Sequence, residues 1–120
     1  FVSLYYILEN AVKYCCPKSN FKILFEEDGN NLNLIFDMLS ITIKDDEVKK
    51  ICQKKFRAES AIALTNDGKG IGMNRVLKTL KLNNAKLEIK PRVTNQSTLH
   101  KDIYYDNNQF IIEFDKTRLI

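Results

Sequence analysis

Hydrophobic positions recur every three or four residues in two stretches of the chain, which is the period of a helix buried along one side. The first stretch covers residues 3–16 and is stopped by Pro17; its apolar positions are Leu4, Ile7, Leu8, Ala11 and Val12. The second runs over residues 72–82, with apolar positions Met73, Val76, Leu77 and Leu80. Asn83 and Asn84 follow it, and asparagine tolerates the left-handed backbone that ends many helices. Two amphipathic helices are therefore predicted.

Short apolar runs rich in aromatic and β-branched residues predict strands in the rest of the chain. These strands cover residues 21–25, 32–36, 87–89, and 104–105 continuing into 110–114, with a turn at 28–31. Asp45 or Asp46 is expected to cap a short helix, and residues 54–67 have no clean period and are predicted to form a loop. The fold class that follows is α+β, a two-layer sandwich with helices on one face of a mixed, mostly antiparallel sheet.

Composition narrows the class of protein. The 120 residues, 44% hydrophobic and 28% charged, suit one small globular domain. No apolar run is long enough to cross a membrane and the first residues lack signal-peptide features, so a cytoplasmic protein without a membrane span is expected. The net charge of +4 is spread among acids, so nucleic acid is not expected as a direct partner. The spacing of the three cysteines, Cys15, Cys16 and Cys52, fits neither a disulfide framework nor a zinc site. Because His100 is the single histidine, a multi-histidine metal centre is excluded.

Two motifs carry candidate chemistry. Gly68, Gly70 and Gly72 alternate just before the second helix, so that backbone N–H groups and the positive end of a helix dipole converge on an anion. On the first helix, Tyr6, Asn10, Lys13 and Tyr14 share one face beside the apolar stripe. An amide oxygen there suits magnesium, which takes few protein ligands, and an ammonium suits phosphate. Taken alone, the glycines are also explained by a tight turn followed by a helix cap. The polar face of the first helix, taken alone, is also explained as a solvated surface.

The two motifs occur together in the order found in a known superfamily. Residues 8–14 (LENAVKY) resemble the N box of the GHKL (Bergerat-fold) ATPases, close to its form in sensor histidine kinases. Residues 68–73 (GKGIGM), the following helix and the strand at 86–89 resemble that family's second glycine box and its surroundings. The resemblance covers nearly the whole chain, is specific at these two boxes and is loose between them.

The resemblance implies a nucleotide, ATP, held with Mg²⁺ under a lid. Asn10 then corresponds to the magnesium-binding asparagine, and residues 54–67 to the lid, where Lys54, Lys55 and Arg57 are placed to touch phosphates. The full set of nucleotide-binding residues that it implies is Asn10, Lys13, Tyr14, Asp37, Gly68, Gly70, Ile71, Gly72 and Met73. It also implies that residues 1–120 are one domain of a larger protein, whose other domains or subunits are its partners.

The first glycine box of the family, an aspartate followed by two glycines and an isoleucine, is degenerate. Residues 35–43 (IFDMLSITI) stand in its place without a glycine. Asp37 is the candidate adenine-reading carboxylate, but counting back from Ile43 puts the expected aspartate at Met38. Ser40 and Thr42 then fill the glycine positions, where their side chains crowd a ligand. Asp37 can equally be an ordinary strand-end residue.

The catalytic groups are also incomplete. Where several family members have a glutamate base one turn before the asparagine, this chain has Tyr6, whose ordinary pKa near 10 makes it a poor base. Glu9 points elsewhere on the helix, and His100 lies in a polar stretch unsuited to a phosphoacceptor. The catalytic residue is thus unknown.

The function expected is an ATP-binding domain that drives phosphotransfer or a slow conformational switch. The alternative is a catalytically degenerate module that senses nucleotide or binds other proteins.

Overall fold

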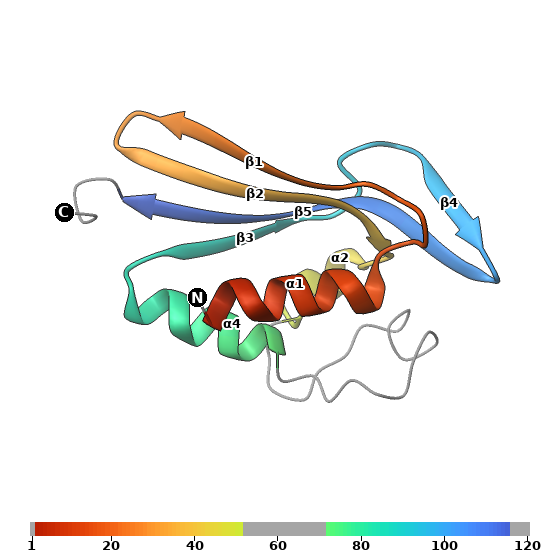
Figure 1. Ribbon diagram of the computed structural model, residues 1–120, viewed down its shortest axis with the longest axis horizontal. Helices are drawn as coiled ribbons and strands as arrows, with labels where there is room; N and C mark the ends of the chain where they lie inside the picture. The colour runs from red at the N-terminus through yellow and green to blue at the C-terminus, as the bar shows by residue number, and fades with distance from the viewer. Residues whose placement is uncertain (1, 52–71, 116–120) are drawn as a thin grey trace.

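The sheet forms one layer of the molecule and the helices form the other (Figure 1). The computed structural model describes residues 2–51 and 72–115. Helix α1 (Val2–Tyr14) and helix α4 (Gly72–Leu82) lie side by side under the sheet, and the short α2 (Asp45–Val48) lies close by. None of the helices in these two segments is long and apolar enough to cross a membrane.

Five strands make up the sheet: β1 (Phe21–Asp28), β2 (Asn31–Ile41), β3 (Lys86–Lys90), β4 (Ser97–His100) and β5 (Ile103–Asp115). The order is β1-β2-β5-β3, and β4 pairs with one end of β5. Every pairing in the described part of the chain is antiparallel. The predicted α+β sandwich, with its helices on one face of a mostly antiparallel sheet, is confirmed.

Strand alternation decides which residues face the helices. Along β2, Phe36 and Met38 are 0% and 4% exposed and pack against Ile7 and Ala11 of α1, in a core that also includes the apolar face of α4. Because successive side chains in a strand point to opposite faces, Asp37 projects from the other face of the sheet. That face carries no described helix (Figure 1).

The strands are longer than the sequence predicted. β2 continues to Ile41 and β5 is unbroken over 13 residues, because each is paired along its length with the other. The sequence pattern did not predict β4, because its residues are mostly polar and the strand forms by pairing with β5. Its turn uses Lys101 and Asp102, both with positive φ (48° and 66°), rather than an Asn-Gly or Asp-Gly sequence.

The helix ends agree in part with the prediction. Asn84 has φ 55°, the left-handed conformation predicted for the end of α4. The predicted cap of α2, Asp45 or Asp46, is wrong, because the cap residue is Lys44 and both aspartates lie in the first turn. The Lys44 backbone N–H donates to the Glu47 carboxylate at 2.9 Å, which closes that turn.

Candidate nucleotide site

Helices α1 and α4 run in opposite directions and contact each other along one flank (Figure 1). One side-chain contact between the two helices joins Tyr6 of α1 to Arg75 of α4. The Arg75 guanidinium donates to the Tyr6 hydroxyl, and its central carbon lies 5.5 Å from the centre of the Tyr6 ring. This combines a hydrogen bond with a cation–π interaction. Tyr6, at the position to which the sequence resemblance assigns a general base, therefore holds the two helices together.

From this contact the position of Asn10 relative to Gly72 follows. Asn10 lies four residues after Tyr6, and Gly72 lies three residues before Arg75. Because the helices are antiparallel, both steps lead in the same direction, by roughly 6 Å and 4.5 Å at the usual helical rise. Asn10 and the N-terminus of α4 thus lie toward the same end of the two neighbouring helices. The described parts of the two predicted motifs therefore lie on neighbouring helices that contact each other.

Asn10 and Lys13 differ in how firmly their side chains are held. Asn10 is half-buried, and its amide forms no hydrogen bond with another residue of the described segments. Lys13 donates to the Glu9 carboxylate at 3.1 Å. Hydrogen bonds from Tyr5 and from Lys13 lower the pKa of Glu9. The ammonium of Lys13 therefore already has an anionic partner, whereas the amide oxygen of Asn10 is available to a ligand.

Two further predicted residues contribute to packing. Tyr14 is half-buried against a small cluster of Cys16, Ile41 and Tyr105. Met73 is 7% exposed and belongs to the main core between the helices and the sheet. Gly68, Gly70, Ile71 and the predicted lid at 54–67 lie outside the described residues.

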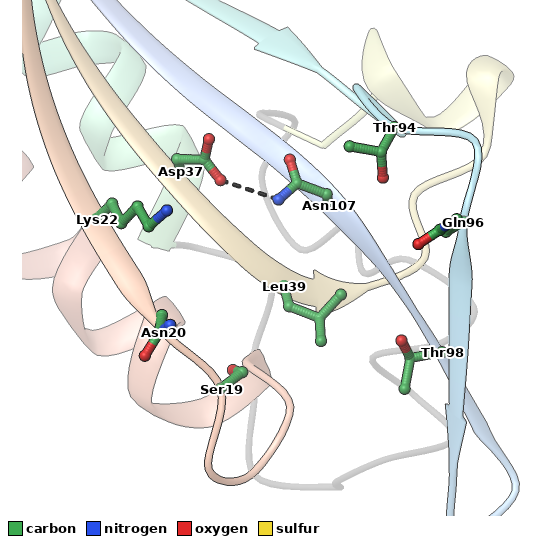
Figure 2. A pocket seen from close by; sticks show the side chains of 9 residues that line it. All are labelled: Ser19, Asn20, Lys22, Asp37, Leu39, Thr94, Gln96, Thr98 and Asn107. Atoms are coloured by element: carbon green, nitrogen blue, oxygen red, sulfur yellow. Dashed lines mark hydrogen bonds between the residues drawn. The ribbon is translucent and has the colours of Figure 1, made fainter.

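Asp37 lies away from this site, on the opposite face of the sheet (Figure 2). Its two carboxylate oxygens accept hydrogen bonds from the side-chain amides of Asn107 and Gln109, each at 3.0 Å. It borders a polar cavity of about 300 Å³ that also contacts Lys22. The structure therefore does not bring Asp37 together with Asn10.

Residues 35–41 of the segment that corresponds to the first glycine box belong to β2, and Thr42 and Ile43 follow the end of the strand. Ser40 is 4% exposed, and its hydroxyl accepts a hydrogen bond from the side-chain amide of Asn108 at 2.8 Å. The same amide donates to the Ile41 carbonyl at 3.1 Å. Thr42 donates from its hydroxyl to the Tyr104 carbonyl at 3.2 Å. Ser40 and Thr42, predicted to stand at glycine positions, are thus bound into the sheet.

Sequence reasoning missed two residues that organise this region, Asn108 and Arg92. Asn108 is completely buried and also accepts a hydrogen bond from the Arg92 backbone N–H at 3.1 Å. The Arg92 side chain donates to the Ile43 carbonyl and to Asp45, which ties α2 to the sheet. Nothing in the spacing of these residues marks them, because their partners lie far away in the sequence.

No protein-family model matches the chain, and no curated protein matches its sequence. Solved structures do match. The mycobacterial sensor histidine kinase MprB superposes with a TM-score of 0.77 at 16% identity over 94% of this chain. The nucleotide-free catalytic domain of histidine kinase ThkA gives a TM-score of 0.68 at 18% identity over 95% of this chain. The chain has the fold of a histidine kinase catalytic domain.

The histidine kinase fold also matches full-length ShkA, solved in complex with AMPPNP, with a TM-score of 0.65 at 14% identity over 93% of this chain. The chain spans 69% of the MprB structure, 65% of the ThkA structure and 20% of the ShkA structure. The resemblance to the GHKL ATPases found in the sequence is thus confirmed at the level of the fold.

Proposed function

We propose that this chain is an ATP-binding domain of the histidine kinase type, which holds Mg-ATP between α1 and the glycine run that ends at Gly72. The observation that supports the proposal is the contact between Tyr6 and Arg75, which turns the face of α1 that carries Asn10 toward the first turn of α4. An N-terminal helix end attracts phosphate through its free N–H groups and its dipole. The AMPPNP bound to ShkA, which shares the fold, supports the same class of ligand.

Asn10 is the residue we assign to the metal. Its half-buried amide oxygen is a hard ligand that is not used elsewhere among the described residues. Magnesium completes its coordination with phosphate oxygens and water and supplies charge neutralisation for them. Gly68 and Gly70 extend the proposed phosphate site, and Lys13 borders it. Asp37 is left outside the proposed site because it faces away from α1.

The reaction that the proposed site can carry out depends on the groups around it. Tyr6 is bonded to Arg75 and is a poor base at neutral pH. Any turnover must therefore rest on positioning and charge stabilisation of the phosphates. We infer slow hydrolysis that drives a conformational switch, or phosphotransfer to an acceptor on another domain or subunit of a larger protein.

The test is calorimetric titration of the purified protein with a non-hydrolysable ATP analogue, with and without magnesium. We expect binding that magnesium strengthens and that Asn10→Ala weakens by about tenfold or more, roughly 1.4 kcal/mol. Val12→Ala is the matched control, since Val12 is 87% exposed on the same helix and points away from α4. Unchanged magnesium-dependent affinity in a folded Asn10→Ala variant would remove Asn10 from the site.

A second candidate function is a degenerate module that keeps the fold and binds other proteins. It is favoured by the segment at the first glycine box, which is paired into β2 and carries Ser40 and Thr42 in place of glycines. Complete absence of nucleotide binding at millimolar ligand would support this function and contradict the first one.

A further inference from the structure

Strand β1 lies at an edge of the sheet, where its eight residues pair with β2 on one side only. It carries apolar side chains toward both faces. Ile23 and Leu24 are each 44% exposed and Phe25 is 74% exposed. An edge strand with an exposed apolar centre, which no other described strand covers on its outer side, is a template for a further strand.

The opposite edge of the sheet is built differently. β3 has only five residues, and three of them are charged: Lys86, Glu88 and Lys90. The Lys90 ammonium lies 3.6 Å from the Glu88 carboxylate. Short length and alternating charge are the usual protections of an edge strand against pairing. β1 is longer, and although four of its eight residues are charged, its centre is an uninterrupted apolar run of Ile23, Leu24 and Phe25. The two edges of the same sheet therefore differ in the length of apolar strand that they offer to another strand.

Exposed apolar side chains lie on the helix-bearing side of β1 and also on α1. Ile23 is paired with Phe36 and Phe25 with Leu34, so both project on the side of the sheet that carries the helices. Leu4 and Leu8 of α1, 36% and 38% exposed, lie on the flank of the helix opposite Tyr6 and hence away from α4. We call these four side chains, Leu4, Leu8, Ile23 and Phe25, the apolar edge.

We propose that the occupant of this edge is a second copy of the chain, with the two β1 strands paired antiparallel about a two-fold axis through Leu24. An axis perpendicular to the sheet keeps the helices of both copies on one side. Opposed residues must then project from the same face, so only registers centred on a residue of β1 are possible.

Charge selects among these registers. Centred on Leu24, the pairing places Lys22 opposite the partner's Glu26 on one face and Ile23 opposite the partner's Phe25 on the other. Centred on Ile23 it would oppose Lys22 to Leu24, and centred on Phe25 it would oppose Leu24 to Glu26. Within the described segments neither Lys22 nor Glu26 forms an ion pair. Among these three registers, only the one at Leu24 opposes Lys22 to Glu26 and gives Ile23, Leu24 and Phe25 apolar partners. It also places Phe21 opposite the partner's Glu27.

The pairing closes on itself. It joins two five-stranded sheets through their apolar edges and brings the exposed flanks of the two α1 helices toward each other over Ile23 and Phe25. The edges left outside are formed by β3, with its charges, and by the short β4 of each copy. A closed dimer, rather than a growing filament, is therefore the product. The inference stands independently of nucleotide binding, because the proposed nucleotide site lies on the other flank of α1.

Sedimentation or light scattering of the purified protein over a dilution series tests the proposal. We expect a dimer that dissociates on dilution. Lys22→Glu places a carboxylate opposite Glu26 twice in the dimer and should weaken association by about tenfold or more. Glu26→Lys should do the same, and the double variant Lys22→Glu/Glu26→Lys should restore it. Lys86→Glu, the same charge change at the β3 edge, is the control and should leave association unchanged.

A folded protein that stays monomeric at high concentration would overturn the proposal, and so would growth into species larger than a dimer. Failure of the double variant to regain the association lost in folded single variants would refute the Leu24 register. Circular dichroism of each variant shows that it is folded, and Glu26→Lys provides an independent single variant if Lys22→Glu disturbs β1 beside Asp37.

Discussion

Asn108 shows how one side chain can organise a region without belonging to a recognisable motif. It is completely buried, and its amide joins β5 to β2 through Ser40 and Ile41 while its oxygen accepts the Arg92 N–H. Removing it leaves several buried polar groups without partners. Since an unsatisfied buried group costs about 1–3 kcal/mol, residues of this kind hold more stability than their size suggests.

Asn108→Ala should therefore lower the free energy of unfolding by about 3 kcal/mol. The neighbouring Asn107 offers a matched control, because it is half-buried and donates to Asp37 on the other face of the sheet. Asn107→Ala should cost about 1 kcal/mol or less. Urea denaturation followed by circular dichroism measures both, and equal losses in the two variants would contradict the importance assigned to the buried network.

At the scale of the element, β2 decides what the site can recognise. Its alternation sends Asp37 to the face without helices, where both oxygens of its carboxylate are engaged by amides. The proposed nucleotide would thus be held chiefly by its phosphates. A pocket that reads a base by hydrogen bonds rejects the wrong base strongly, whereas phosphate contacts are the same for all nucleoside triphosphates.

Under the proposed function, we accordingly expect ATP and GTP analogues to bind with dissociation constants within about tenfold of each other. Competition calorimetry with the two magnesium complexes measures the ratio. A preference for ATP of a hundredfold or more would show that another group reads adenine, and would contradict this account of β2.

Sequence patterns predicted the helices well because their apolar stripes pack on one continuous core, as Met73 and Val76 of α4 show. They predicted the strands less well, since the length of β2 and the existence of β4 depend on pairing with β5, a distant element. In the candidate site, Asn10 and Gly72 could be predicted because each belongs to a motif of neighbouring residues. The contact between Tyr6 and Arg75 joins residues 69 positions apart, so no local pattern could reveal it.

At the scale of the whole molecule, stability should depend on alkaline pH. Burial, and next to it the neighbouring Cys16, raise the pKa of the Cys15 thiol from 9.0 to about 11, and burial also raises the pKa of Tyr105. Above the ordinary pKa the unfolded chain loses these protons while the folded chain keeps them. The unfolded state is therefore favoured as pH rises, and the loss is complete only above the folded pKa.

The free energy of unfolding should thus fall between pH 9.0 and about 11, the interval set by the Cys15 thiol. Because the thiol is only half-buried, solvent screening reduces its contribution to about 1 kcal/mol. Urea unfolding under reducing conditions across this interval measures the effect. In Cys15→Ala, the free energy of unfolding should fall less steeply with pH. A slope identical in the variant and the parent protein would assign the effect to other groups.

The alternation along β2 also constrains how this sequence can change over evolutionary time. Met38, the position where the family's aspartate is expected, is 4% exposed in the main core, so an aspartate there would bury a carboxylate among apolar side chains. Asp37 can reach the helical face only if the strand gains or loses a residue, which would turn its apolar side chains outward. Neither route is open to a single tolerated mutation. The difference between this segment and the glycine box that it resembles is therefore hard to remove, and lineages that carry this segment are expected to retain it.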